Sequence, residues 1–125
     1  MSPLASAIYE ILRHRANLSE PRITYKELAE QLREQSEEFE AIYQRSQALY
    51  VALGDVGRAC RRLRLPSLPA LVVRADTKRP GEAYFAGKCS GAVFRGEKIA
   101  VWRKEVEAIK KSRYPRLQSR RGGSR

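Results

Sequence analysis

One stretch of the sequence concentrates arginines at the spacing of a helix. Its members are Arg58, Arg61, Arg62 and Arg64. A guanidinium group binds phosphate through paired, charge-assisted hydrogen bonds, and residues three or four positions apart share one side of a helix. These arginines therefore predict a short basic helix that approaches the groove of a nucleic acid. Arg74, Lys78 and Arg79 follow in the sequence, and we expect them to contact the neighbouring backbone.

Residues suited to catalysis are fewer than the basic residues suited to binding phosphate. Asp76, Thr77 and Lys78 follow an apolar segment and match the acid-x-Lys half of a metal-dependent nuclease core. Such a core holds Mg²⁺ with a second carboxylate, which Asp55 or Glu82 would have to supply. We interpret the run as a turn, and a nuclease remains the alternative.

The chain contains few histidines and cysteines that could act in catalysis or bind a metal. His14 is the one histidine, and the two cysteines, Cys60 and Cys89, form no C-x-x-C pair. We expect His14 at the end of a helix and Cys60 on an apolar helix face. Both thiols are expected to be reduced, with a Cys60–Cys89 disulfide as the alternative. No catalytic residue, metal site or cofactor is predicted.

The chain is basic, and its charge is unevenly distributed. The 125 residues include 25 lysines and arginines against 14 aspartates and glutamates, a formal net charge of +11. Residues 27–40 hold six acids and one base, residues 56–80 seven bases and one acid, and residues 98–125 ten bases and two acids. This polarity favours a polyanion as partner, because each phosphate neutralised by a cation releases counterions. We expect double-stranded DNA foremost; RNA, and a protein partner for the acidic 27–40 stretch, are alternatives.

The length and apolar content limit the class of protein. A chain of 125 residues suits one domain, and no apolar run approaches the 18 residues of a membrane span. The first ten residues carry neither a basic start nor an apolar stretch of signal-peptide length. We therefore expect a cytoplasmic protein without a membrane partner. The sequence makes no prediction of its oligomeric state.

Helical signals occupy the first half of the chain. Apolar residues at helical spacing predict a first helix over about Pro3–Ala16. Thr24 and Glu27 fit the two ends of a capping box, so a second helix should begin there. Apolar spacing predicts a third helix over about Glu37–Leu53.

Gly54 and Asp55 should interrupt that third helix, because glycine disfavours a helix interior and aspartate is a good N-cap. A fourth, short helix is then expected over about Val56–Arg64. Its apolar residues would face the core and its arginines would face outward. This is the predicted recognition helix.

The second half of the chain contains strand signals. The β-branched run Ala70–Arg74 predicts a strand, and Glu82–Phe85 is expected to return beside it as a β-hairpin. The turn between them, Asp76–Gly81, would carry Lys78 and Arg79 at its tip.

A short strand at Ala92–Phe94 and a final amphipathic helix over Lys98–Ser112 complete the predicted elements. The order of elements is that of a winged helix-turn-helix. The predicted fold class is therefore α+β, mostly helical, with a β-hairpin wing. The domain would span residues 1–115, and residues 116–125 would form a basic, disordered tail.

Three segments resemble the DNA-binding domain of O6-alkylguanine-DNA alkyltransferases and alkyltransferase-like proteins. Ile23–Ala29 is similar to the family's strand-to-helix run, and Val56–Arg61 to its recognition helix. Leu68–Val73 is similar to the strand that follows. The resemblance implies that Tyr25 touches the phosphate of a flipped nucleotide and that Arg61 fills the gap left in the base stack.

The resemblance does not extend to the acceptor cysteine, which in the family lies in a Pro-Cys-His-Arg run. Here Pro69 is followed by Ala70-Leu71-Val72. Alkyl transfer is therefore not carried over, and the resemblance implies DNA binding alone.

The hypothesis is a non-catalytic DNA-binding protein. A small nuclease or ribonuclease toxin, and a protein inhibitor of a nucleic-acid enzyme, remain the alternatives. The predicted nucleic-acid-binding residues are Tyr25, Arg58, Arg61, Arg62, Arg64, Arg74, Lys78, Arg79, Lys110, Lys111 and Arg113.

Overall fold

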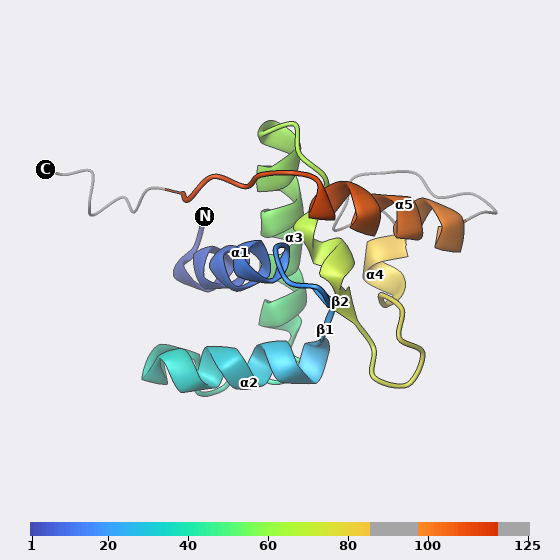
Figure 1. Ribbon diagram of the computed structural model, residues 1–125. Helices are drawn as coiled ribbons and strands as arrows, with labels where there is room; N and C mark the ends of the chain where they lie inside the picture. Colours follow the sequence, from blue (N-terminus) through green and yellow to red (C-terminus); the bar gives the residue numbers. More distant parts are fainter. Residues whose placement is uncertain (86–97, 118–125) are drawn as a thin grey trace, which may run out of the picture.

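The computed structural model describes residues 1–85 and 98–117, which form helices around two short strands (Figure 1). The elements in chain order are α1 (Pro3–Arg15), β1 (Ile23–Thr24), α2 (Tyr25–Gln35), the 3-10 helix η1 (Glu37–Phe39), α3 (Gln47–Arg62), the 3-10 helix η2 (Leu68–Leu71), β2 (Val72–Val73), α4 (Glu82–Phe85) and α5 (Lys98–Lys110). No helix within residues 1–85 and 98–117 combines the length and the apolar character needed to cross a bilayer. Cys89, the predicted strand at Ala92–Phe94 and most of the tail, 118–125, lie outside the described residues.

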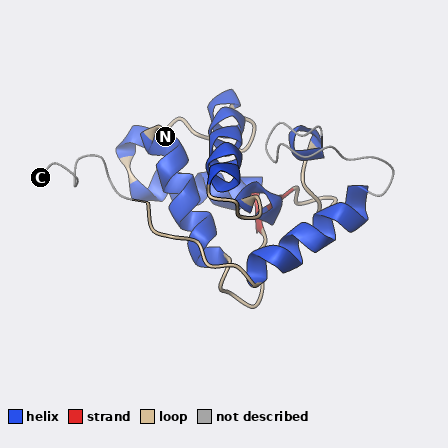
Figure 2. Ribbon diagram, turned by 90° about the horizontal axis from the view of Figure 1, so that it is seen from above, coloured by secondary structure: helices blue, strands red, loops and turns tan. Residues whose placement is uncertain are grey.

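The two strands pair in parallel although they are far apart in the sequence. Ile23–Thr24 lies in register with Val72–Val73. Figure 2 shows this pair, in red, among the surrounding helices. Because the strands are parallel, the chain leaves both of them at the same end of the sheet. Tyr25 and Arg74, the residues that follow the two strands, are therefore brought to that end.

The core is built around α3. Both α1 and η2 pack against this helix, and α5 packs on η2. The largest fully buried side chains are Ile8, Tyr9, Leu12, Ile23, Leu28, Leu32, Leu49, Leu53, Leu68, Leu71, Tyr84 and Ile109. Burying one such side chain contributes roughly 1.5–3 kcal/mol, so the core fixes which face of each helix remains outside.

Local sequence signals are confirmed at three helices. The first helix, α1, and the last, α5, lie where apolar spacing predicts them. The capping box is complete, because Thr24 Oγ1 accepts the Glu27 N–H at 3.0 Å and Glu27 Oε1 accepts the Thr24 N–H at 3.0 Å. His14 is exposed in the last turn of α1, and Cys60 is buried in the core, both as predicted.

The predicted third and fourth helices are wrong in their bounds. Residues 37–39 form one 3-10 turn, and a single helix, α3, runs unbroken through Gly54 and Asp55. Asp55 is not an N-cap, since its carboxylate pairs with Arg58 one turn later. Leu53 and Val56, on either side of the glycine and aspartate, are buried. Their burial outweighs the cost of about 1 kcal/mol for a glycine inside a helix.

The predicted β-hairpin is also wrong. The predicted return strand, Glu82–Phe85, is the helical turn α4, and the strand predicted over Ala70–Arg74 shortens to β2, which pairs with β1. Both residues of β2 are buried, as suits a parallel strand covered on two faces. Residues 74–79, here named the basic loop, are exposed, and the Arg74 N–H closes the loop by donating to the Arg79 carbonyl at 2.8 Å.

Polar contacts hold α5 against the segment that leads into β2. The Trp102 indole N–H donates to the Ala70 carbonyl at 2.8 Å in the interior. The Glu105 carboxylate accepts the Ser67 backbone N–H at 2.6 Å. These bonds fix which side of α5 faces the core and which side faces the basic loop.

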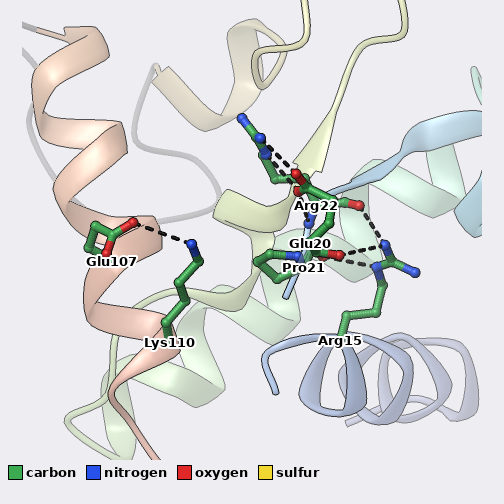
Figure 3. Close-up of polar contacts among 6 residues, drawn as sticks. All are labelled: Arg15, Glu20, Pro21, Arg22, Glu107 and Lys110. Carbon is green, nitrogen blue, oxygen red and sulfur yellow. Dashed lines mark hydrogen bonds and ion pairs between the residues drawn. The ribbon is translucent and has the colours of Figure 1, made fainter. Parts of the chain in front are cut away.

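Arg15, at the end of α1, holds the turn that leads into β1. Its Nε donates to the Pro21 carbonyl at 2.9 Å, and its Nη2 donates to the carbonyls of Glu20 and Arg22 at 3.1 and 2.6 Å (Figure 3). A guanidinium presents these donors in one fixed plane, which a lysine ammonium cannot reproduce. Arg15 therefore positions the chain where it enters the sheet.

We predict that Arg15→Lys lowers the free energy of unfolding by roughly 1–2 kcal/mol although it keeps the charge, because charge-assisted bonds to the turn are lost. The matched control is Arg13→Lys, which retains an ion pair with Glu10 on the same helix and should cost under about 0.5 kcal/mol. Urea unfolding followed by circular dichroism measures both. Equal losses in the two variants would contradict the role given to Arg15.

Candidate nucleic-acid interface

A broad hollow of about 1210 Å³ opens at the end of the sheet where both strands finish. It is lined by residues 24–26, 44, 45, 74–76 and 81–83 and by one side of α3. We name this hollow the groove. Ligands of α/β proteins commonly bind outside the carboxyl ends of parallel strands, and the groove has that position.

One stripe of α3 forms a wall of the groove. Its members are Gln47, Tyr50, Val51, Gly54, Arg58 and Arg61. The spacings of three, one, three, four and three residues follow one side of a continuous helix. Leu49, Leu53, Val56 and Cys60 form the neighbouring buried stripe, so core packing sets the rotation of α3 and directs Arg58 and Arg61 to the groove.

The predicted basic residues divide into three groups. Arg58, Arg61 and Arg74 line the groove together with Tyr25. Lys78, Arg79 and Lys110 line a second hollow beside α5. Arg62, Arg64, Lys111 and Arg113 are exposed and line neither hollow.

The separation of Arg61 from Arg62 has a geometric cause. Successive residues of an α-helix are rotated by about 100°, so the two adjacent side chains cannot lie in the same stripe. Arg64 lies beyond the last residue of α3 in the left-handed region, with φ of 59°. The structure therefore brings two of the four clustered arginines into the groove.

Among the described residues that line the groove, positive charge exceeds negative charge. The cations are Lys26, Arg45, Arg58, Arg61 and Arg74, and the carboxylates are Asp76 and Glu82. Arg74 pairs with Asp76 at 2.9 Å, and Arg58 with Asp55. Within the described part of the chain, Lys26, Arg45 and Arg61 form no ion pair. These three side chains are thus available to an anion.

Two cations of the groove, Lys26 and Arg45, are not among the binding residues predicted from the sequence. Lys26 follows Tyr25 in the first turn of α2 and is exposed. The capping box predicts where this helix begins, but not which of its side chains face the groove. Arg45 was expected inside a helix over residues 37–53, but it lies in the turn before α3. Only the true start of α3 at Gln47 places Arg45 at the rim of the groove.

Tyr25 joins the start of α2 to the chain beyond the basic loop. Its hydroxyl accepts the Gly81 N–H at 3.0 Å, and its ring lies 5.5 Å from the ring of Tyr50, measured between centroids. The Tyr50 hydroxyl donates to the Gln44 carbonyl at 3.0 Å. The two rings therefore form an aromatic wall of the groove between α2, α3 and the loop.

Asp76 is occupied by hydrogen bonds. Its Oδ1 accepts from Arg74 Nε at 3.0 Å and from the Thr77 N–H at 2.8 Å, and its Oδ2 accepts from Arg74 Nη2 at 2.9 Å. The bonds from Arg74 above all hold the pKa of the carboxyl at about 2. No three histidine, cysteine, aspartate or glutamate side chains cluster as metal ligands in residues 1–85 and 98–117. Residues 75–77 form a turn, as expected from the sequence.

Comparison with known proteins yields no family, no curated protein and no solved structure that matches this chain.

The contact between Tyr25 and Gly81 generates a prediction about coupling. Tyr25→Phe should lower the free energy of unfolding by about 1 kcal/mol through the lost hydrogen bond. Gly81→Ala should also destabilise, because the added Cβ would lie 3.3 Å from the Tyr25 hydroxyl oxygen. The Tyr25→Phe background removes that oxygen, and the next ring atom is 3.8 Å away. In the Tyr25→Phe background, Gly81→Ala should therefore lower the free energy of unfolding by less than it does in the wild type. A double-mutant cycle by urea unfolding measures the difference. Strictly additive losses would contradict the contact.

Proposed function

We propose that this protein binds nucleic acid, double-stranded DNA foremost, through the groove and without catalysing a reaction. The observation that carries the proposal is the set of cations Lys26, Arg45 and Arg61, which border one hollow and have no carboxylate partner in the described residues. Phosphates of a nucleic-acid backbone are the ligands that such a set suits best.

The shape of the interface supports a duplex as partner. Arg58 and Arg61 lie in the last two turns of α3, and the basic loop follows at the side of the groove. A helix can enter a DNA groove while an adjacent basic loop contacts the backbone, as in winged helix-turn-helix proteins. In this proposal, α3 is the recognition helix. The basic loop contacts the DNA backbone as a wing does, although it is a loop and not a β-hairpin.

The resemblance to alkyltransferase DNA-binding domains adds support, because its three segments lie together. Two of them contain the paired strands, and Tyr25 and Arg61 both border the groove. Alkyl transfer is no part of the proposal. Ala70 follows Pro69 where the acceptor cysteine would lie, and burial raises the pKa of the Cys60 thiol to about 11. A buried, protonated thiol is a poor nucleophile.

The two adjacent arginines provide a matched test. We expect Arg61→Gln to weaken duplex binding roughly fivefold to tenfold and to reduce the slope of log K against log salt by about one. Arg62→Gln removes the same charge one residue away, outside the groove, and should produce a smaller loss. Fluorescence anisotropy of a labelled duplex at several salt concentrations measures both variants.

The comparison is decisive because the net charge of the two variants is equal. A loss that is the same for both, or larger for Arg62→Gln, would show that overall charge and not the groove governs binding. Circular dichroism of each variant checks that the fold is retained.

The nuclease alternative leads to an opposite expectation. Since Arg74 occupies both carboxylate oxygens of Asp76, we predict that the protein with Mg²⁺ leaves duplex DNA, single-stranded DNA and RNA uncut. Gel analysis of end-labelled substrates after prolonged incubation measures this. Cleavage that Asp76→Asn abolishes would replace the binding proposal with a nuclease.

A further inference from the structure

A second hollow, of about 590 Å³, lies on the other side of the basic loop. It is bordered by residues 20–22, by residues 77–79 and by the side of α5 that carries Trp102, Arg103 and Lys110. We name it the α5 cleft. Figure 3 shows part of its wall, with the ion pair of Glu107 and Lys110 on α5 facing the turn of residues 20–22.

The carboxylates of the α5 cleft are already neutralised. Glu20 accepts hydrogen bonds from the Arg22 guanidinium at 2.9 Å, which hold the pKa of its carboxyl at about 2. Glu107 pairs with Lys110 at 3.4 Å. The two acids therefore balance two of the cations that border the cleft.

Three further cations border the α5 cleft: Lys78, Arg79 and Arg103. All three are exposed and have no ion pair within the described residues. Lys78 also has a φ of 61°, in the left-handed region where glycine would be less strained. The loop thus carries a cation at a position where backbone conformation alone would favour glycine.

The residues of the cleft suit a phosphate better than a base. Among the described residues, Trp102 is the only aromatic one on its border, but Trp102 is 4% exposed and its indole is bonded to the Ala70 carbonyl. A ring buried to this extent offers no free face for base stacking. The accessible groups are the guanidinium and ammonium groups, whose preferred partner is a phosphate oxygen.

The basic loop connects the α5 cleft to the groove. Arg74 and Asp76 border the groove, whereas Lys78 and Arg79 border the cleft. The two arms of the loop are joined by the hydrogen bond between Arg74 and Arg79. Arms joined in this way lie about 5 Å apart, and phosphates of one DNA strand follow each other at about 3.4 Å of axial rise. A strand that crosses the loop would therefore meet the cleft within a few phosphates of the groove.

We propose that the α5 cleft is a second backbone clamp, in which Lys78, Arg79 and Arg103 hold a phosphate of the same nucleic acid that occupies the groove. This inference rests on the proposed function. It extends the interface across the basic loop to the exposed side of α5.

The test uses two optical signals on the full chain. Trp102 is the only tryptophan and borders the cleft but not the groove, so its emission reports on occupation of the cleft. Anisotropy of a labelled duplex reports total binding. Three variants are compared with the wild type: Arg79→Gln/Arg103→Gln in the cleft, Arg61→Gln in the groove, and Lys104→Gln/Arg116→Gln, whose exposed cations border neither hollow.

We expect duplex binding to change Trp102 emission in the wild type, in the Arg61→Gln variant at saturation and in the Lys104→Gln/Arg116→Gln control. The cleft variant should lose that change, bind the duplex roughly tenfold more weakly and show a salt slope reduced by about one to two. The control should match the wild type within about twofold.

Two results would overturn the clamp while the proposed function stands. One is a cleft variant that retains both the emission change and the affinity of the control, while Arg61→Gln still weakens binding. The other is an emission change that inorganic phosphate produces and the duplex does not, which would assign the cleft to a free anion. A wild type without duplex binding would instead overturn the proposed function together with the clamp.

Discussion

The parallel pairing of Ile23–Thr24 with Val72–Val73 is the contact on which the rest of the arrangement depends. It is short, but it joins a segment near the N-terminus to one from the middle of the chain. Because the strands run in the same direction, the start of α2 and the start of the basic loop leave the sheet at one end. Tyr25 and Arg74 meet the exposed stripe of α3 there. An antiparallel hairpin would have sent the basic loop elsewhere.

Two supports keep this pairing in place. Arg15 holds the chain that enters β1, and the Trp102 indole bonds the segment that leads into β2. The capping box at Thr24 then begins α2 immediately after β1. Each support acts on the backbone at a strand end, and the Trp102 bond lies in the interior. The cations of the groove can therefore remain on the surface without holding the fold together.

The distribution of charge is consistent with this separation between the bonds that hold the strands and the cations on the surface. The acidic residues of the 27–40 stretch lie on α2, η1 and the turn that follows, and none of them borders the groove or the α5 cleft. In both hollows, carboxylates such as Asp76 and Glu20 are matched by a neighbouring arginine, and further cations remain. A polyanion would thus meet attraction over the basic loop and repulsion over α2.

The sequence predicted those features that depend on neighbouring residues. The capping box, the apolar stripes of α1 and α5 and the burial of Cys60 are local patterns, and the structure confirms them. The continuity of α3 was missed because burial of Leu53 overrides the breaking tendency of Gly54. The sheet was missed because strands of two residues carry almost no periodicity.

Residue type alone predicted which side chains could bind phosphate, but it did not predict how the fold groups them. The arginines and the basic loop are of residue types that suit a phosphate partner, whereas Tyr25 was predicted from the family resemblance alone. Their division between the groove, the α5 cleft and the open surface depends on the rotation of α3 and on the path of the chain after β2. Both are set by core packing between distant segments, which residue spacing does not encode.

The position of the groove as the contact surface is the central claim, and a titration of the ¹⁵N-labelled protein with a short DNA duplex tests it most directly. We predict that the amide signals of Lys26, Arg61 and Arg74 shift together and saturably, while those of Glu30 and Glu34 on α2 stay in place. Shifts centred on the acidic helix, or none at any of these residues while the duplex binds, would contradict it.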